Sequence, residues 1–533
     1  MAGTAGTETR NGRARGSRAA AAVATVLGLV GTATACGGTS AGGGSAVTVA
    51  VAGDPGSLSP TTALAGTALA MNSFAYDTLV HLDAEGAPVP GVAEKWSATT
   101  TSATFTIRPG VTCEDGSALT AEDVAAEYNH IADRKNRSPL LGLSVPVTAV
   151  AKADAAARTV TVTTTKPAPF IVEMARLLPL VCEESLAKPA ALARTTNASG
   201  PYRLAEAVPG DHYTYVKRDG YRWGPGGSTG AGLPGKVVVK VVANESTAAN
   251  LLMAGQINVA LVNGADQDRL DAARVKYRSL EALFGQLMFN QAVGRPTADP
   301  AVREALVSVL DLKQLGAVAT GGKGRTPTRT GEIAPTPCTG DTVGGNLPAH
   351  DPAKAATALT EAGWTKSGGT WTKDGRPLAI GLAYATNLGP QVASAVELAV
   401  QQWTSFGVRA TAKPTGSGSI VGVLGGGDWD IAWAPVGVTL PDQLTQFYDG
   451  PPPPKGNNFG SVANPDYRRL TAEAAARPGA TGCALWDAAE AALVKRVDIA
   501  PIVSKANRYY AKGVTFEVDG NGIVPSTLRR SAD

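Results

Sequence analysis

The sequence predicts a mixed α/β protein that is folded into two or three lobes. Its 533 residues are 44% hydrophobic, which is enough apolar material for more than one core. Segments with strand-like and helix-like patterns follow one another without a strict strand-helix-strand rhythm, and no internal repeat is visible. These observations favour several lobes that each combine helices with strands.

The N-terminus has the pattern of an export signal. Four arginines precede an uncharged apolar run from Ala19 to Val30, as in the charged and apolar regions of a signal peptide. The run is shorter than the roughly 20 apolar residues that a membrane-spanning helix needs. We therefore expect residues 1–35 to direct export and to be removed.

Small residues surround Cys36 in a pattern that resembles a bacterial lipobox. Ala33-Thr34-Ala35 precede this cysteine, although lipoboxes usually carry leucine at the position of Ala33. The resemblance implies that the Cys36 thiol receives a diacylglyceryl group and that Cys36 becomes the first residue of the mature chain. Residues 36–45 are rich in Gly and Ser, which predicts a flexible tether. Ordinary signal cleavage, with Cys36 as a bystander, is the alternative.

Charge argues against a nucleic-acid partner. The full chain carries a formal charge of +3, but without residues 1–35 it has 44 basic and 44 acidic residues. No broad cationic surface is implied, so we expect no nucleic-acid partner. The four histidines, His81, His130, His212 and His350, are far apart and form no metal-binding motif, so neither a metal site nor a cofactor is expected.

The strands and helices can be placed from their periodicity and end signals. Thr120, as N-cap, with Asp123 in the first turn predicts the start of a helix over 121–132. Asp351 followed by Pro352 predicts another helix start. Strands are expected at 46–51, 104–107, 158–165 (solvent-edged) and 236–242 (central), further helices at 246–254, 300–309, 352–362, 392–406 and 484–497, and an exposed polyproline loop at 451–454.

Short motifs of one family follow each other in order along nearly the whole mature chain. They occur at residues 76–80 (YDTLV), 90–96 (PGVAEKW), 107–111, 115–116, 119–124 (LTAEDV), 199–204 (SGPYRL), 219–224, 254–260, 289–290, 302–306, 351–355 and 361–364 (EAGW). Each motif alone is weak, but together they resemble the family 5 extracellular solute-binding proteins, the oligopeptide, dipeptide and nickel class.

This resemblance implies an architecture and a function. The expected fold is α/β and periplasmic-binding-protein-like (class II, cluster C type), with two large lobes joined by a hinge and a small extra lobe. Lobe I would comprise 46–77, 196–285 and 505–533, lobe II 78–195, and lobe III 286–504. The resemblance implies a monomer, lipid-anchored to the outer face of the cell membrane. It would capture a peptide or peptide-like small molecule between the lobes and deliver it to ABC transporter permease subunits.

The four cysteines after Cys36 predict two disulfides. An even number of cysteines in an exported protein is typical of disulfide bonding, and four cysteines allow three pairings. Pairing Cys113 with Cys182 and Cys338 with Cys483 is preferred, because the other pairings would join different predicted lobes. Four buried free thiols are the alternative.

Residues 428–437 resemble the family's strand and loop ending W-x-A-D-Y, whose Trp lines the cleft and whose Asp accepts the peptide α-ammonium. Trp433 matches the Trp, but Val436 stands in place of the Asp. A buried ammonium without a carboxylate is costly, so an ordinary peptide in the usual pose is in doubt. Asp442 could replace this Asp, unless it is a solvated loop residue. The predicted ligand contacts are Trp433, Val436, Asp442, Asn290 and Leu58.

Other functions were weighed against ligand capture for transport. An exported hydrolase finds no support, because no known pattern places a His beside a candidate Ser or Cys and S-x-x-K lacks its companion motifs. We therefore expect no enzymatic activity. A lipoprotein sensor with the same fold, or a binder of a non-peptide solute such as an opine, sugar or metal chelate, remains an alternative.

Overall fold

The computed structural model describes residues 46–62, 66–182, 186, 190–416 and 420–531. The predicted signal (1–35), Cys36 and the tether (36–45) lie outside the described residues. Residues 44–533 cluster as one unit. Their main element is a ten-stranded mixed sheet with the order β17 (Arg409–Thr415), β16 (Ala379–Ala385), β18 (Ile431–Trp433), β12 (Lys276–Phe289), β19 (Ile499–Ala511), β11 (Val259–Leu261), β1 (Val47–Val51), β10 (Lys236–Val241), β9 (His212–Lys217) and β8 (Tyr202–Val208).

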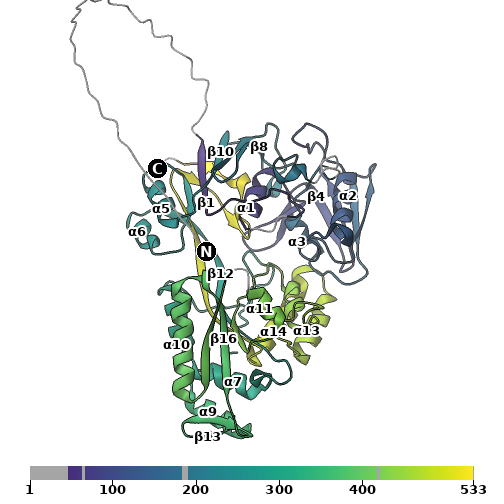
Figure 1. Ribbon diagram of the computed structural model, residues 1–533. Helices are drawn as coiled ribbons and strands as arrows, with labels where there is room; N and C mark the ends of the chain where they lie inside the picture. Colours follow the sequence, from purple (N-terminus) through teal and green to yellow (C-terminus); the bar gives the residue numbers. More distant parts are fainter. Residues whose placement is uncertain (1–45, 63–65, 183–185, 187–189, 417–419, 532–533) are drawn as a thin grey trace, which may run out of the picture. The chain divides into compact units, whose positions relative to one another are not determined.

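Two long strands, β12 and β19, form the middle of this sheet. They pair antiparallel from Lys276↔Ala511 to Met288↔Ile499, with register shifts around Gly285. Figure 1 shows β12 passing from the region of β1 and β10 to the region of β16 and α10. These strands therefore connect the two halves of the sheet. The β-branched run expected to be a central strand is β10, which lies between β1 and β9.

A second, four-stranded sheet has its own core. Its order is β4 (Ala93–Ala98), β5 (Ser102–Ile107), β7 (Thr159–Thr163) and β6 (Val150–Asp154), and α2 (Ala121–Ala132) contacts β6 and β7. The apolar core extends from Leu79 to Cys182 and includes Trp223. We expected 158–165 to form a strand at the solvent edge of its sheet. This is wrong, because β7 lies inside the sheet, paired with β5 on one side and with β6 on the other.

The predicted helix start at Thr120 is confirmed in detail. The Thr120 Oγ1 accepts a hydrogen bond from the Asp123 backbone N–H at 3.2 Å, and the Asp123 carboxylate accepts one from the Thr120 N–H at 2.6 Å. This reciprocal capping box satisfies two backbone donors that the helix itself leaves unpaired. Asp351 likewise caps α9, with Pro352 as the first helical residue.

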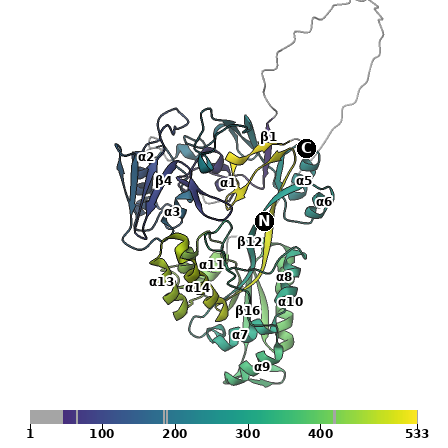
Figure 2. The same cartoon turned by 180° about the vertical axis from the view of Figure 1, so that it is seen from behind.

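The remaining helices pack against the large sheet or form the parts beside it. Figure 2 shows α8 (Leu312–Thr320) and α10 (Pro390–Phe406) side by side, and the Gln402 side chain on α10 bonds both to Gln314 and to the Asp311 N–H at the start of α8. The other helices of the described residues are α1 (Gly66–Ala75), α3 (Ile171–Met174), α5 (Glu245–Met253), α6 (Asp266–Ala272), α7 (Pro300–Val309), α9 (Pro352–Glu361), α11 (Ile420–Gly426), α12 (Thr445–Tyr448), α13 (Pro465–Ala475) and α14 (Cys483–Lys495).

Short hairpins and two disulfides complete the fold. The disulfides join Cys113 to Cys182 and Cys338 to Cys483, the pairing that the sequence favoured. The second of them ties the long loop after α8 to the first residue of α14. The small sheets are β13 (Thr365–Ser367), β14 (Thr370–Lys373) and β15 (Arg376–Pro377); β2 (Val80–Leu82) with β3 (Pro88–Pro90); β20 (Val514–Thr515) with β23 (Arg529–Arg530); and β21 (Val518–Asp519) with β22 (Gly522–Ile523).

Candidate functional site

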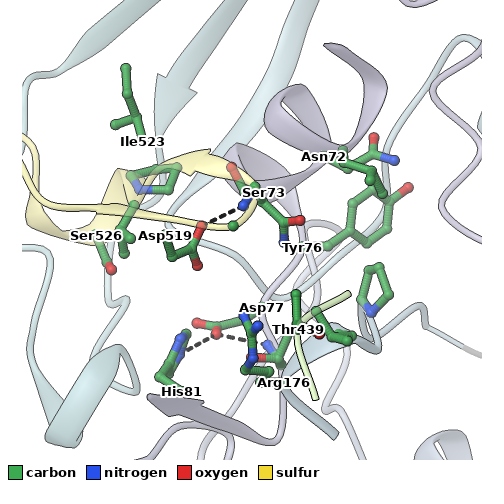
Figure 3. Close-up of a pocket in the computed structure, with 18 of the residues that line it drawn as sticks. Asn72, Ser73, Tyr76, Asp77, His81, Arg176, Thr439, Asp519, Ile523 and Ser526 are labelled. Carbon is green, nitrogen blue, oxygen red and sulfur yellow. Dashed lines mark hydrogen bonds and ion pairs between the residues drawn. The ribbon is translucent and has the colours of Figure 1, made fainter. Parts of the chain in front are cut away.

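A cavity of about 310 Å³ lies where several distant segments of the chain meet; we call it the α1 cavity. Helix α1 and the residues after it form one wall, and the β21–β22 hairpin with residues 524–526 forms another. Leu140, Leu143, residues from 176–179, residues 437–439 and Gln443 lie on the remaining sides. Figure 3 shows Asn72, Ser73 and Tyr76 entering from α1, with Asp519 and Ser526 on the C-terminal segment.

Much of the α1 cavity wall is apolar. Such walls favour a ligand with an apolar body, because binding removes apolar surface on both sides from water. The apolar lining comes from six separate parts of the chain: Leu69, Leu140, Leu143, Leu177, Ile333, Val438 and Ile523.

The wall formed by Ile333 and Val438 is held by backbone pairing. The Val438 N–H donates to the Gly331 carbonyl at 2.6 Å, and the Ile333 N–H donates to the Val438 carbonyl at 2.7 Å. Gly331 has φ +74°, and a Cβ there would lie 2.7 Å from the Val436 carbonyl oxygen. Glycine is therefore required at this contact, because a side chain would both strain the backbone and clash.

Asp77 is a satisfied carboxylate on the cavity wall. Its Oδ2 accepts a hydrogen bond from the Tyr221 hydroxyl at 2.5 Å, and its Oδ1 accepts one from the Thr78 N–H at 2.8 Å. His81 Nε2 lies 2.8 Å from the same Oδ1, close enough for an ion pair when the ring is protonated. Burial and the neighbouring Asp77 charge raise the pKa of Tyr221 well above its usual value, so this phenol remains a donor.

Three other polar side chains on the cavity wall lack partners. Arg176, on the short 3₁₀ turn Ala175–Leu177, is only 6% exposed, and its Nε and Nη2 donate to no described group. Within the described residues, the amide nitrogen and the amide oxygen of Asn72 have no hydrogen-bond partner. The Tyr76 hydroxyl has none either. Buried polar groups normally have hydrogen-bond partners, so this cluster calls for an explanation. A ligand in the cavity would supply those partners.

A second cavity, of about 550 Å³, adjoins the first. It lies at the carboxyl end of β1 and is lined by Val51, Phe74, Val242 and Tyr509, among others. Residues 520, 521 and 523 of the β21–β22 hairpin line both cavities. Its two most polar lining side chains already bond within the protein: Glu245 accepts from the backbone of Asn263 and Gly264, and Asn263 donates to Asn507. It therefore offers a ligand fewer unsatisfied groups.

Asp442 lies beside the α1 cavity but is not among the residues that line it. Its Oδ1 is enclosed and has no hydrogen-bond partner in the described part of the chain. Burial and the nearby Glu173 raise the pKa of Asp442 to about 7, and burial raises the pKa of Glu173 to about 7 as well. Both are thus partly protonated at neutral pH. Asp442 is half-buried on the short 3₁₀ turn Pro441–Leu444, with its Oδ1 enclosed, and it does not line the cavity.

The structure places Trp433 in the core and away from the α1 cavity. It is 1% exposed, and its Nε1 donates to the Phe284 carbonyl at 3.2 Å. A Cβ on Gly285 would lie 2.6 Å from the Trp433 ring, so the indole packs directly on the β12 backbone. The family pattern placed this Trp on a cleft wall, but here the register shift at Gly285 opens a space that the ring fills.

The other three predicted contacts are also buried, and none lines the α1 cavity as described. Val436 belongs to the core of α13 and α14, and only the residues after it, from Gly437, reach the cavity. Asn290 donates to the Gly427 and Trp429 carbonyls at 3.1 and 2.9 Å, which fixes a loop. Leu58 packs in the core beneath β1. The structure therefore does not bring the five predicted residues together.

The sequence did contain signals for the residues that were missed. Arg176 is the one basic residue within the apolar segment 168–180, whose other charged residue is Glu173, and Asn72 is a lone amide in the helix 66–75. A polar residue inside an otherwise apolar element is either paired or functional. The C-terminal residues 519–526 had no such signal, because they reach the cavity only through the fold.

Among the described residues, no group of three or more His, Cys, Asp or Glu side chains is placed to hold a metal ion. No helix in the same part of the chain has the length and apolar character needed to cross a membrane.

Comparisons with known proteins identify the family. The model of bacterial extracellular solute-binding proteins, family 5, middle region, matches residues 87–453. Protein XP55 of Streptomyces lividans is 29% identical over 398 residues, which cover 69% of this chain and 67% of that protein. The periplasmic murein peptide-binding protein MppA of Escherichia coli is 25% identical over 508 residues, covering 85% and 86% of the two chains.

A solved structure agrees with this assignment. The substrate-binding protein from Microbacterium hydrocarbonoxydans, complexed with 4-hydroxybenzoate hydrazide, is similar with a TM-score of 0.71 and 27% identity. The similarity covers 92% of this chain and 100% of that chain. Together with the family match over more than half of the sequence, it shows that the protein belongs to the family 5 extracellular solute-binding proteins of ABC importers, with their periplasmic-binding-protein-like α/β fold.

Proposed function

We propose that this protein captures a small organic solute in the α1 cavity and delivers it to the permease of an ABC importer. The observation that carries this proposal is the combination of apolar walls with buried, unpartnered polar side chains in one cavity. Apolar walls supply the driving force for binding, while a few polar groups fix the orientation of the ligand. Asn72, Tyr76 and Arg176 are the polar groups available for this purpose.

The size of the cavity limits the ligand. At about 310 Å³ it is at the small end of the range of roughly 300–1,000 Å³ for ligand pockets. This favours a short peptide, a peptide-like molecule or another compact solute over a long peptide. The relatives provide an example of a peptide and of another compact solute. MppA is named for a murein peptide, and the Microbacterium protein was complexed with 4-hydroxybenzoate hydrazide.

An ordinary peptide bound through its amino terminus is disfavoured at position 436. Val436 is an apolar, buried residue, and the nearest acid on the same loop, Asp442, is partly protonated at neutral pH. Neither residue lines the α1 cavity, so a peptide in the family's usual pose, with its ammonium group at this loop, would lie outside the cavity proposed here. A ligand inside the α1 cavity is therefore better described as peptide-like than as a peptide in the usual pose.

The place of action follows from the N-terminus and from the family. The signal-like residues 1–35 and the lipobox-like cysteine support export and lipid attachment at Cys36, on the outer face of the cell membrane. A monomer tethered by residues 36–45 could reach both free solute and the membrane-bound permease.

Ligand capture can be tested by a thermal-shift screen followed by calorimetry. The screen would cover short peptides, amino-acid derivatives, opines, sugars, aromatic acids and hydrazides. Leu143→Trp would fill the α1 cavity, so it should weaken binding of every ligand found by at least tenfold. Val150→Trp is the matched control, because Val150 is 51% exposed on β6 and lines neither cavity. Unchanged affinity in Leu143→Trp would show that the ligand binds elsewhere.

A further inference from the structure

Arg176 differs from the other deeply buried arginines of the chain. Arg303 donates to backbone carbonyls and lies 3.1 Å from the Asp498 carboxylate, and Arg218 donates to four backbone carbonyls and a threonine hydroxyl. Arg176 has no such set, because its Nε and Nη2 find no acceptor among the described residues. Two of the three guanidinium nitrogens of this residue, which is only 6% exposed, are thus enclosed without a partner.

The surroundings of Arg176 show how this charge is held. Burial lowers its pKa, while the charge of Asp519, across the same cavity, acts in the opposite direction. A guanidinium nevertheless keeps its proton in proteins, so the cavity wall carries a fixed positive charge. Asp77 does not compensate it directly, because its oxygens accept from Tyr221 and Thr78 and face His81.

Two neutral groups could donate hydrogen bonds to the same acceptor group of a ligand as Arg176. The Asn72 amide and the Tyr76 hydroxyl line the same cavity and are unpartnered in the described structure. Burial raises the pKa of Tyr76 well above its usual value, so its hydroxyl stays a donor. Figure 3 shows Asn72, on α1, and Tyr76, which follows α1, on one side of the cavity and Arg176 with Asp77 and His81 on another. The cavity thus presents several donors and one unpaired cation.

We infer that the ligand carries a single carboxylate, or a similar planar oxyanion, on an apolar body, and that Arg176 selects this group. The inference rests on the proposed function of the α1 cavity. Arg is suited to the task because its rigid fork of N–H donors matches a carboxylate in a bidentate pair. Asp519 would repel a second anionic group, so a monoanion is preferred over a dianion.

The inference can be tested with matched acid and amide probes in calorimetry at pH 7. The probe pairs are N-acetyl-leucine with N-acetyl-leucinamide, 4-hydroxybenzoate with 4-hydroxybenzamide, and glycyl-leucine with its amide. For every pair that binds, the acid should bind the wild type at least tenfold more tightly than the amide. Arg176→Gln should abolish this preference, and Arg176→Lys should retain part of it. Arg222→Gln, an exposed arginine outside the cavity, should leave the preference unchanged.

The possible results separate this inference from the proposed function. Probes that bind with equal affinity as acid and amide, or an acid preference that survives in Arg176→Gln, would overturn the inference and leave ligand capture intact. Failure of all acids and amides to bind would count against the proposed function and overturn the inference with it. The wild-type comparison of acid with amide decides the matter even if Arg176→Gln folds poorly.

Discussion

Trp433 packs its indole directly on the backbone of Gly285, at the point where the pairing of β12 with β19 changes register. The same indole donates from Nε1 to the carbonyl of Phe284, the residue that is skipped in the pairing of β12 with β19. A Cβ at Gly285 would lie 2.6 Å from Trp433 Cζ2 and 2.9 Å from Val503 Cγ1. The packing of Trp433 on Gly285 therefore stabilises β12 where it joins the two halves of the large sheet.

Gly285→Ala should destabilise the fold. The added methyl group would have to displace the Trp433 ring and Val503, and such overpacking typically costs about 1–3 kcal/mol. Urea unfolding would measure the loss. Gly235→Ala is the control, since no atom lies within 4 Å of a Cβ there. Equal stability of the two variants would contradict the packing described for Gly285.

The stability of the wild type should fall between about pH 4 and pH 7 because of Asp442 and Glu173. Their pKa values in the folded state are raised to about 7, whereas in the unfolded chain both ionise near pH 4. The folded state therefore binds more protons than the unfolded chain in this pH range. As a result, the free energy of unfolding decreases as the pH rises from about 4 to 7. Above about pH 7 both carboxyl groups are ionised in the folded state, so they cause no further decrease in the free energy of unfolding.

Asp442→Asn removes one of these charges and should be more stable than the wild type at pH 8, by on the order of 2 kcal/mol. The difference should shrink towards pH 5, where the wild-type carboxyl is protonated. Denaturant midpoints at the two pH values give the comparison, with the exposed Asp219→Asn as control. Parallel pH profiles of Asp442→Asn and the wild type would show that this carboxyl titrates normally.

Removal of the Cys338–Cys483 disulfide should destabilise the loop that carries Ile333 to the cavity. The bridge closes a separation of 145 residues, and loss of a native disulfide typically costs about 2–5 kcal/mol. The double variant Cys338→Ser, Cys483→Ser should unfold at lower urea concentration than the wild type. Peptide mapping without reduction should recover both pairs of the structure. A Cys113–Cys338 peptide would contradict the fold in this region.

Cys36→Ala tests the predicted lipid anchor. If the Cys36 thiol is lipidated, the wild type should fractionate with membranes when expressed in its host, while the variant is released or stays unprocessed. The physical reason is that an acyl chain contributes about 0.8 kcal/mol per buried methylene group to membrane binding. Identical fractionation and identical migration of both proteins would rule out lipidation at Cys36.

Local signals in the sequence predicted local structure well. The cap of α2 by Thr120 and Asp123 and the start of α9 at Pro352 depend on atoms within four residues of each other, so the sequence contains all that decides them. The mixed α/β class and the family were also predictable, because the motifs occur in order. The start of α13, where Asn464 caps a helix beginning at Pro465, has the same signature and was missed.

The site was less predictable because distant segments build it. Trp433 matched the family pattern, but its place depends on a register shift between strands more than 200 residues apart in the chain. Arg176 and Asp519 meet at one cavity only after the C-terminal hairpin has folded back onto α1. No local pattern contains such a relationship, so the sequence predicted the class of protein but not the walls of its cavity.

The crystal structure of the protein with the tightest ligand from the screen tests the central claim most directly. Our account predicts that the ligand occupies the α1 cavity, between α1 and the β21–β22 hairpin, with an oxyanion within hydrogen-bond distance of Arg176 Nε or Nη2. A ligand that lies instead in the neighbouring 550 Å³ cavity at the end of β1, with the α1 cavity filled only by water, would contradict it.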